Sequence, residues 1–312
     1  MEIGITVVIP YFNNSSVFQR TLDSIFNQKL QPQEVIIVDD CSDDSDVLKN
    51  IINLNKKKTN ISIVYIRNKN NKNGAYCRNL GIKESRFEII AFLDADDYWH
   101  ENHLFLSINH MQMKNVDFLF SNVIEIKRNK RKVRKVSNPK LLKNVNDILF
   151  LSPPQTNSFL INRNIYIENK IFFDENLKRH QDYQFLIDSL NSGIKWDYID
   201  INTAFYCIPE KNKGFNIDYN SMLYFWDKHY QMFTKNLVRS YILGICVDCF
   251  FYKGKSFLLN SIENKENILF VKDDPLLKYM FKFKSISGKL RLVFKFLHYI
   301  KNDKSFFIKL FK

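Results

Sequence analysis

Three aspartates, Asp94, Asp96 and Asp97, stand at the end of an apolar run in residues 88–94. Side chains two residues apart in an extended segment point the same way, so we expect Asp94 and Asp96 to face one ligand, with Asp97 turned toward its margin. Carboxylates this close repel one another unless protons or a cation intervene. A hard divalent ion, Mg²⁺ or Mn²⁺, that also binds diphosphate oxygens would relieve the repulsion. Capping of a helix that starts near residue 98 explains one aspartate but not three.

A second acidic pair, Asp39 and Asp40, ends the apolar run in residues 34–40. Carboxylates in this position can accept hydrogen bonds from the N–H groups of a base or from ribose hydroxyls. Turn formation and helix capping are the competing explanation, and they suit residues 42–45 better than the pair itself. We therefore expect Asp39 and Asp40 to recognise a base and a ribose.

The residues that carry this chemistry lie in a regular alternation of two patterns. Short, almost continuous apolar runs rich in β-branched residues predict buried strands, and the segments between them have the period of amphipathic helices. The expected strands are residues 3–11, 34–40, 61–68 and 88–94, and the expected helices are residues 17–28, 46–57, 74–85 and 98–111. This order is typical of βαβ units, and it predicts an α/β domain whose parallel sheet is covered on both faces.

In such a sheet, ligands bind beyond the carboxyl ends of the strands, where the strand order switches. Residues 10–14, the Asp39–Asp40 pair and Asp94 with its neighbours all follow expected strands. The sequence therefore predicts that these side chains meet at one edge of the sheet.

The periodic pattern loosens in the second half of the chain. We predict one domain over residues 1–210, made of a parallel half, 1–115, and a mixed half, 116–210. Residues 211–312 are expected to form a helical extension that is basic and rich in aromatic residues.

The 312-residue chain carries a formal net charge of +13, which predicts attraction to nucleic acid, an anionic membrane surface or a phosphate-bearing substrate. Residues 127–135 form a basic run, whose ordinary explanation is a solvated loop. Residues 289–312 have the pattern of a basic amphipathic helix, which fits either a membrane surface or a helix docked on the domain. No window reaches the roughly 18 apolar residues of a membrane span, and signal-peptide features are missing, so we expect a cytoplasmic catalytic face.

Five motifs follow one another between residues 3 and 190. They are VVIPYFNN, EVIIVDDCSDDS, NGAYCRNLGI, FLDADDYW and HQDYQFLI. Together they resemble family 2 glycosyltransferases of the GT-A fold, a Rossmann-like mixed sheet flanked by helices. The resemblance implies a nucleotide-sugar donor, most often a UDP-sugar, with Mn²⁺ or Mg²⁺ as cofactor and inversion at the anomeric carbon. Residues 1–115 would then bind the donor and residues 116–210 the acceptor.

The resemblance also implies roles for single residues. The donor-binding residues would be Pro10, Tyr11, Phe12, Asn13, Asp39, Asp40, Gly74, Arg78, Asp94, Ala95 and Asp96. Asp96 and Asp97 would be the metal ligands, with Asp94 nearer the ribose. Two residues depart from the family pattern: Phe12 stands where many members carry Tyr, and Cys77 stands where Ala is common.

A general base is needed because an acceptor hydroxyl attacks an anomeric carbon well only if its proton is removed as the bond forms. Within HQDYQFLI, Asp182 matches the base position of the family, and Gln181 replaces the usual Glu. Spacing alone favours a solvated Asp182 paired with Lys178 or Arg179, and the resemblance favours catalysis. The implied mechanism is a single in-line displacement without a covalent sugar intermediate.

The resemblance further implies an acceptor that is a glycan or a polyprenyl-diphosphate-linked oligosaccharide, used to build O-antigen, capsule or lipooligosaccharide at the inner membrane face. The basic residues in 127–135 and 289–312 fit such a phosphate-bearing, membrane-bound acceptor. We therefore expect peripheral association with the membrane.

Two other functions explain parts of the pattern. A nucleic-acid-binding protein would account for the net charge, but no nucleic-acid module is recognisable and the charge is spread along the chain. A nucleotidyltransferase also places metal-binding carboxylates at a sheet edge, but that class usually has a Gly-rich basic loop after its first strand. Residues 9–16 contain neither glycine nor lysine. We therefore favour sugar transfer and expect no nucleic-acid partner.

Overall fold

The structure is a computed structural model that describes residues 3–128, 130–208 and 218–247. The chain divides into two compact units, residues 1–216 and 217–312. The domain boundary predicted at residue 210 and the basic helix predicted over residues 289–312 both lie outside the described residues.

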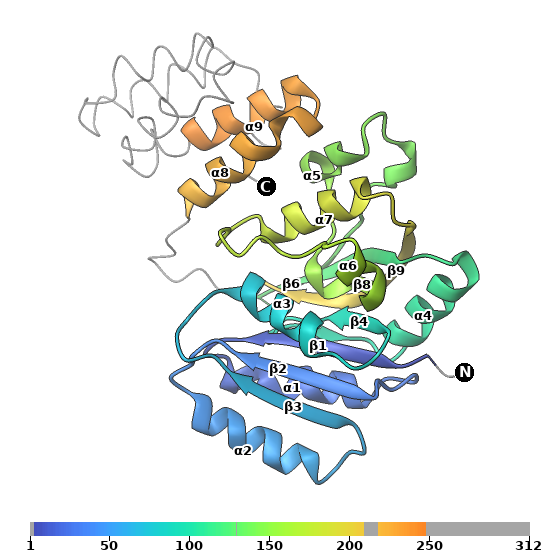
Figure 1. Cartoon of the computed structure of the whole chain (residues 1–312), viewed down its shortest axis with the longest axis vertical. Helices are drawn as coiled ribbons and strands as arrows, with labels where there is room; N and C mark the ends of the chain where they lie inside the picture. The colour runs from blue at the N-terminus through green and yellow to red at the C-terminus, as the bar shows by residue number, and fades with distance from the viewer. Residues whose placement is uncertain (1–2, 129, 209–217, 248–312) are drawn as a thin grey trace, which may run out of the picture. The chain divides into compact units, whose positions relative to one another are not determined.

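The described part of the first unit contains a nine-stranded mixed sheet (Figure 1). Its strands are β1 (Ile5–Tyr11), β2 (Glu34–Asp39), β3 (Ser62–Arg67), β4 (Ile89–Phe92), β5 (Tyr98–Trp99), β6 (Phe118–Lys127), β7 (Lys130–Arg134), β8 (Leu160–Asn162) and β9 (Trp196–Cys207). Their order is β3-β2-β1-β4-β8-β6-β9-β5, with β7 paired to β6. The first four strands of this order are parallel, and β8 is antiparallel to both of its neighbours. The sheet is therefore mixed, as predicted, with a run of parallel strands at one end.

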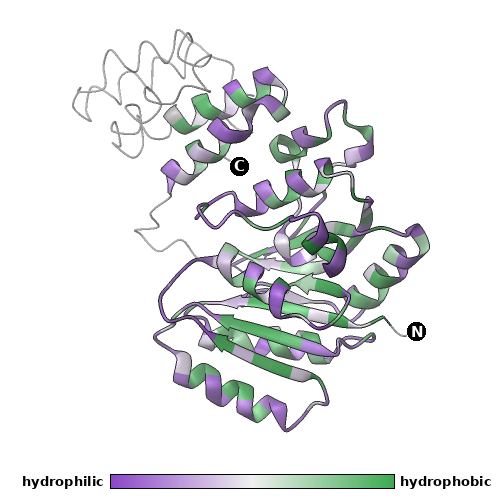
Figure 2. Cartoon of the chain, viewed as in Figure 1, coloured by the Kyte–Doolittle hydropathy of each residue, from purple (hydrophilic) through white to green (hydrophobic). Residues whose placement is uncertain are grey.

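The described part of the first unit also contains seven α-helices. They are α1 (Ser15–Phe26), α2 (Ser45–Lys56), α3 (Gly74–Glu84), α4 (His103–Lys114), α5 (Ile148–Leu151), α6 (Arg163–Glu168) and α7 (Gln181–Asn191). All six residues of β2 are buried. Val35 and Ile37 belong to the core cluster that includes α1 and α2, whereas Ile36 and Val38 pack against Cys77 of α3. Successive side chains of a buried strand thus serve opposite faces, which is why the central strands are mostly hydrophobic (Figure 2).

Helix α3 lies unusually close to the sheet. A Cβ atom at Gly81 would overlap the side chain of Val8 in β1, so this position admits only glycine without a shift of the helix. The close approach brings the C-terminal part of α3 directly against β1.

The segment after the acidic motif differs from its prediction. A helix is predicted over residues 98–111, but Tyr98 and Trp99 form β5, which pairs antiparallel with Phe205 and Ala204 of β9. Helix α4 begins only at His103. Tertiary strand pairing therefore overrides the local helical pattern at these two residues.

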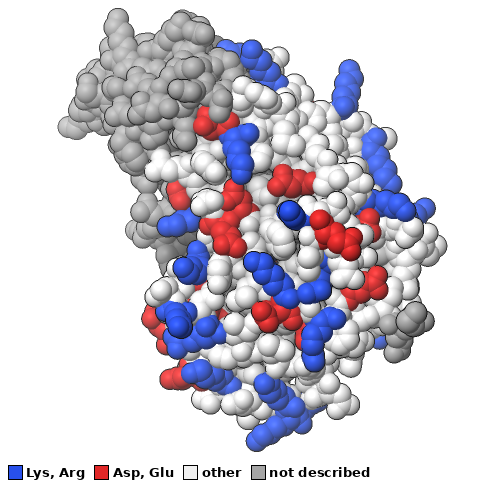
Figure 3. Space-filling model, in the orientation of Figure 1, with Lys and Arg blue, Asp and Glu red and all other residues white. Residues whose placement is uncertain are grey.

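The described part of the second unit is helical, as predicted. It comprises α8 (Tyr219–His229) and α9 (Lys235–Val247), and Trp226 of α8 packs against Phe233 and Tyr241 at centroid distances of 5.1 and 4.9 Å. Within the described ranges, no helix is both long and apolar enough to span a bilayer. On the face drawn in Figure 3, lysines and arginines are interspersed with acidic residues.

Candidate active site

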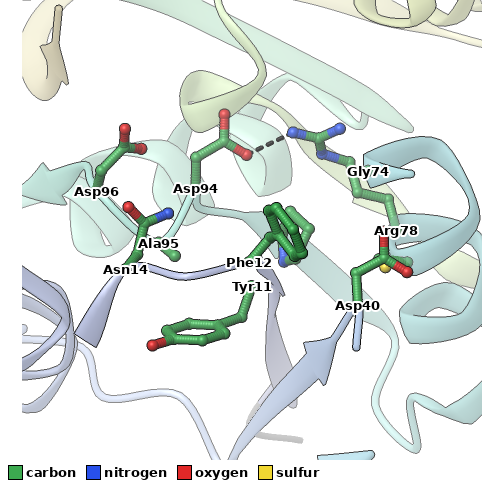
Figure 4. A pocket seen from close by; sticks show the side chains of 11 residues that line it. Tyr11, Phe12, Asn14, Asp40, Gly74, Arg78, Asp94, Ala95 and Asp96 are labelled. Carbon is green, nitrogen blue, oxygen red and sulfur yellow. Dashed lines mark hydrogen bonds and ion pairs between the residues drawn. The ribbon is translucent and has the colours of Figure 1, made fainter. Parts of the chain in front are cut away.

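A cavity of about 220 Å³ lies at the carboxyl ends of β1, β2 and β4. Strands β2 and β3 follow on one side of β1, and β4 lies on its other side, so the cavity sits where the strand order switches. Its lining residues are Pro10, Tyr11, Phe12, Asn14, Asp40, Gly74, Cys77, Arg78, Asp94, Ala95 and Asp96 (Figure 4). Nine of the eleven residues predicted to bind the donor are in this list. Asn14 and Cys77 also line the cavity; both lie within the motifs but were not among the predicted donor-binding residues.

The wall formed by β1 and β2 combines an exposed ring with a fixed carboxylate. Phe12 is 49% exposed. Asp40 is buried, and its oxygens accept hydrogen bonds from Asn68 Nδ2 and the backbone N–H of Lys72, both at 2.8 Å, and from the N–H of Asn73 at 2.9 Å. The Asp40 carboxylate is therefore held in one orientation beside a flat apolar surface.

Asp39 does not line the cavity, although its neighbour does. It is fully buried and accepts hydrogen bonds from Ser42 N–H at 2.9 Å, Ser45 Oγ at 2.8 Å and the Tyr65 hydroxyl at 2.7 Å. Burial alone would raise the pKa of Asp39, but these hydrogen bonds outweigh it and lower the pKa below its ordinary value. The prediction that Asp39 contacts a ligand is corrected, because both of its oxygens organise the loop after β2.

Asn13 is also outside the set of lining residues. It adopts a left-handed conformation with φ of 51°, which asparagine tolerates better than most residues. Its N–H donates to Ser42 Oγ at 3.1 Å, and its Oδ1 accepts from the N–H of Asp43 at 2.8 Å. Asn13 is predicted to contact the donor. In the structure it instead connects the loop after β1 to the loop after β2.

Arg78 forms the opposite wall. Its side chain is buried, with Nη2 at 2.5 Å from Asp94 Oδ1 and Nη1 at 3.0 Å from Gln181 Oε1. The guanidinium also lies over the Phe173 ring at 5.4 Å from the centroid. A Cβ at Gly74 would come within 3.0 Å of Nη1, so the glycine leaves room for the guanidinium. Arg78 thus links the first turn of α3 to the acidic motif after β4 and to α7.

The loop with Asp94 and Asp96 is held in place by helix α1. Arg20 Nη2 donates to the carbonyl of Asp96 at 2.6 Å. The buried Thr21 hydroxyl lies at 2.9 Å from the carbonyl of Ala95 and at 2.8 Å from that of Asp97. Three consecutive carbonyls are therefore fixed by two neighbouring side chains, a support that the motifs alone did not predict.

Asp94 and Asp96 are close enough to repel one another. Burial, and secondly the charge of Asp94, raise the pKa of Asp96 to about 6. Within the described residues, no group of three or more His, Cys, Asp or Glu side chains forms a metal site. Mg²⁺ and Mn²⁺ nevertheless fit this pair, because Mg²⁺ is commonly held by one or two carboxylates plus phosphate oxygens and waters, and Mn²⁺ prefers similar oxygen ligands.

Asp97 occupies a different place from the predicted one. It is 1% exposed, and its two oxygens accept hydrogen bonds from Asn157 Nδ2 at 2.8 Å and from the N–H of Cys207 at 2.7 Å. Burial, together with the charges of Asp94 and Asp96, raises the pKa of Asp97 well above its ordinary value. The predicted metal-ligand role of Asp97 is corrected, because its oxygens join the acidic loop to β9.

Asp182 lies at the second residue of α7, next to Gln181, and is half-buried. Burial raises the pKa of its carboxyl, and the positive charge of Arg78 opposes that rise. In the described part of the chain, the carboxylate has no side-chain hydrogen-bond partner. It does not line the cavity itself, but the interaction of Arg78 with both Asp94 and Gln181 places it on the same side of the site.

Tyr206 of β9 does not line the cavity but lies near its acidic residues, and the motifs did not indicate it. Burial, and then the charges of Asp97, Asp94 and Asp182, raise the pKa of its hydroxyl to about 12. Among the described residues, this hydroxyl has no hydrogen-bond partner. Tyr206 is therefore a protonated donor close to the acidic groups, and its sequence context indicates only a strand.

Comparison with known proteins agrees with this geometry. Residues 6–192 match the model of glycosyl transferase family 2. A Staphylococcus aureus (strain N315) protein, poly(ribitol-phosphate) beta-N-acetylglucosaminyltransferase TarP, is 30% identical over 204 residues. The match covers 62% of this chain and 61% of TarP, so the chain spans less than two thirds of that relative.

Two solved structures share the fold. S. aureus TarS 1-349 in complex with UDP-GlcNAc superposes with a TM-score of 0.57 at 16% identity, over 79% of this chain and 67% of that chain. The mannosyltransferase PcManGT from Pyrobaculum calidifontis, in complex with GDP-Man and Mn²⁺, superposes with a TM-score of 0.56 at 14% identity, over 99% and 84% of the two chains. These similarities confirm the predicted GT-A fold. Since the family model matches more than half of its residues, the chain belongs to glycosyl transferase family 2.

Proposed function

We propose that this chain transfers a sugar from a UDP-sugar to a hydroxyl of a lipid-linked or polymeric surface glycan, with inversion at the anomeric carbon. The observation that carries the proposal is the convergence of Asp40, Arg78, Asp94 and Asp96 on one cavity at the switch point of a family 2 domain. The activity by which TarP is named and the UDP-GlcNAc bound to TarS support an N-acetylglucosaminyl or related UDP-sugar donor and, from TarP, a polymeric acceptor.

The donor's nucleoside would lie between Phe12 and Asp40. The Phe12 ring offers a face for the base, and the fixed Asp40 carboxylate can accept a hydrogen bond from a base N–H or a ribose hydroxyl. Pro10, Tyr11 and Asn14 would complete this part of the site.

The diphosphate would lie toward Asp94 and Asp96. These two residues would hold Mn²⁺ or Mg²⁺, which when bound supplies positive charge to the departing diphosphate. Arg78 orients Asp94 through its 2.5 Å ion pair and brings a second positive charge to the same wall. Binding of GDP-Man and Mn²⁺ by PcManGT supports a cation in a site of this fold.

Asp182 would act as the general base. Its carboxylate takes the proton of the acceptor hydroxyl as that oxygen forms a bond to the anomeric carbon, and the bond from that carbon to the diphosphate oxygen breaks on the opposite side. Because the pKa of Asp182 is raised, its carboxylate is a stronger base than that of an ordinary aspartate. The charge of Asp182 is one of the causes that raise the pKa of Tyr206, so this hydroxyl would stay protonated beside the base during the reaction.

A donor screen tests this function. The purified chain is incubated with Mn²⁺ and a panel of nucleotide sugars, and the release of nucleoside diphosphate is measured with and without EDTA. We expect one UDP-sugar to be hydrolysed slowly, only with metal. Release of pyrophosphate would instead indicate a nucleotidyltransferase, and metal-independent turnover would contradict the assigned role of Asp94 and Asp96.

Peripheral association with the inner face of the cell membrane is part of the proposal. It is supported by the basic amphipathic pattern of residues 289–312, which lie outside the described part of the structure. Deleting these residues should reduce sedimentation of the protein with anionic vesicles. Unchanged sedimentation would remove this segment from the proposal.

A further inference from the structure

Strand β7 carries four cationic residues out of five, and it lies next to the acidic site. Lys130, Arg131 and Lys132 are exposed, and in the described part of the chain none of them pairs with a carboxylate. Only Arg134 does so, with Nη1 at 3.4 Å from Glu125 Oε1. An uncompensated cationic edge costs electrostatic free energy unless an anionic partner binds there.

One of these cations belongs to a stack of four planar groups. The rings of Tyr98 and Phe205 are stacked at 4.5 Å, with an interplanar angle of 12°. The Arg20 guanidinium lies over Tyr98 at 4.8 Å, and that of Arg131 lies over Phe205 at 5.7 Å. Both guanidiniums thus lie over aromatic rings, and each has N–H groups that can still donate to a ligand.

The Tyr98 hydroxyl lies within the field of both arginines. Burial raises its pKa, and the charges of Arg131 and Arg20 oppose that rise. Across the described residues, this hydroxyl has no hydrogen-bond partner. Two guanidiniums and a phenol thus bring several hydrogen-bond donors and two positive charges together, and charged donors of this kind bind phosphate groups.

This cluster borders the proposed catalytic site. Arg20 donates to the carbonyl of Asp96 at 2.6 Å and to Cys207 Sγ at 3.4 Å. Cys207 and Arg131 are both register partners of Ile126 in β6, so all three side chains lie on the same face of the sheet. A ligand bound by Arg20 and Arg131 would therefore lie beside the loop that carries Asp96.

We propose that Arg131, together with Arg20 and Tyr98, binds a phosphate group of the acceptor. The inference rests on the proposed sugar transfer, and it specifies that the acceptor is a phosphate-bearing glycan rather than a neutral one. Arg131 is the residue to test, because Arg20 also supports the Asp96 loop and its replacement would disturb donor binding.

The test uses the full chain and two separate titrations. The first titrates UDP with Mn²⁺ and reports on the proposed function alone. The second titrates farnesyl diphosphate into the UDP-saturated protein, so that the donor's diphosphate site is already filled, with farnesol as the neutral probe. Circular dichroism checks that each variant is folded.

We expect Arg131→Glu to weaken farnesyl diphosphate binding on the order of tenfold, with UDP binding unchanged. Arg131→Lys should retain part of the affinity, and Tyr98→Phe should show a smaller loss because it keeps the ring. Lys57→Glu is the matched charge reversal, at an exposed position directly after α2. It should leave farnesyl diphosphate binding unchanged.

Three results would overturn the inference. One is equal binding by wild type and Arg131→Glu, and another is equal weakening by Lys57→Glu, which would reflect net charge alone. The third is loss of phosphatidylglycerol vesicle binding in Arg131→Glu with unchanged farnesyl diphosphate binding, which would assign the surface to membrane lipid. Failure of the UDP titration would instead count against the proposed donor.

Discussion

Arg78 of helix α3 and Asp94 after strand β4 form an ion pair at 2.5 Å on the wall of the cavity. The Arg78 side chain is only 8% exposed and Asp94 is 31% exposed, so one partner is anchored in the protein and the other faces the ligand. The same guanidinium binds Gln181 at the start of α7. This single side chain therefore connects the loop after β4 to the helix that carries Asp182.

Replacing Arg78 should distinguish the effect of its positive charge from the effect of its two simultaneous contacts with Asp94 and Gln181. Arg78→Lys keeps the charge but cannot reach Asp94 and Gln181 from two nitrogen atoms at once. We expect donor turnover to fall on the order of a hundredfold in Arg78→Lys, and further in Arg78→Gln. The measurement is nucleoside diphosphate release. Gln181→Ala, which removes one of the two contacts, should have a smaller effect, and full activity of Arg78→Lys would contradict the proposed role.

Asp182→Asn should abolish proton transfer without changing the shape of the site. We expect the rate of sugar transfer to fall by about a thousandfold, because a general base commonly contributes factors of that size. UDP binding, measured by calorimetry, should stay within about twofold. The exposed Asp23→Asn variant is the isosteric control. Near-normal transfer by Asp182→Asn would rule out this residue as the base.

Thr21 offers a test of the loop support. Thr21→Val preserves the side-chain shape but leaves the carbonyls of Ala95 and Asp97 without its hydroxyl. We expect the free energy of unfolding to decrease by roughly 2 kcal/mol, together with weaker metal-dependent donor binding. Thr21→Ser retains the hydroxyl and should recover most of both properties. Equal stability of the Val and wild-type proteins in urea would show that the hydroxyl does not support the loop.

Asp96 and Asp97 should respond differently to the same substitution. Asp96→Asn should lose Mn²⁺-dependent donor binding and keep its stability, because Asp96 lines the cavity. Asp97→Asn places an amide against the donors Asn157 Nδ2 and Cys207 N–H, and should lower the free energy of unfolding by about 1 to 3 kcal/mol. Thermal unfolding and calorimetry distinguish the two outcomes. The opposite pattern would restore Asp97 as a metal ligand.

His103 should contribute a loss of stability as the solution becomes mildly acidic, opposite in sign to the contribution of carboxyls with a raised pKa such as Asp96. His103 is fully buried, its Nδ1 contacts Thr203 Oγ1 at 2.7 Å, and burial lowers its pKa to about 3. Below the ordinary histidine pKa, the unfolded chain binds a proton that the folded chain does not, so stability is lost as pH falls toward the folded value.

The expected slope from His103 is at most about 1.4 kcal/mol per pH unit between about pH 6 and pH 4. Urea unfolding of wild type and His103→Gln measures it, and the difference between the two should shrink as pH falls. The exposed His100→Gln variant is the matched control. His180 has a pKa lowered in the same direction, so part of the slope should persist in His103→Gln. Identical slopes in all three proteins would contradict this account.

Periodicity predicts the layers of this fold because each buried strand must be apolar on both faces. It also predicts which strand ends meet, since parallel strands bring their carboxyl ends to one edge. Asp94 and Asp96 follow that rule, and the alternation of side chains indicates that Asp97 turns aside. These features depend on local sequence and on the sheet alone.

Other features depend on contacts between distant segments. Asp39 and Asp40 are adjacent and chemically identical, and only the loop geometry decides that Asp40 meets the cavity while Asp39 binds Ser45 and Tyr65. Tyr206 lies near the acidic residues because β9 pairs with β6 far from the motifs. Neither outcome has a signal in the spacing of the residues involved.

The contact between Gly81 and Val8 limits how this enzyme can diversify. A larger residue at position 81 would overlap Val8 unless α3 or Val8 moved. Arg78 belongs to the same helix, so such a shift would also displace its guanidinium from the cavity wall. We therefore expect new donor or acceptor preferences to arise at exposed positions away from α3, such as Phe12 or the edge strand β7. A laboratory search for altered specificity should therefore randomise Phe12 and the residues of β7 and keep Gly81 and Val8 unchanged.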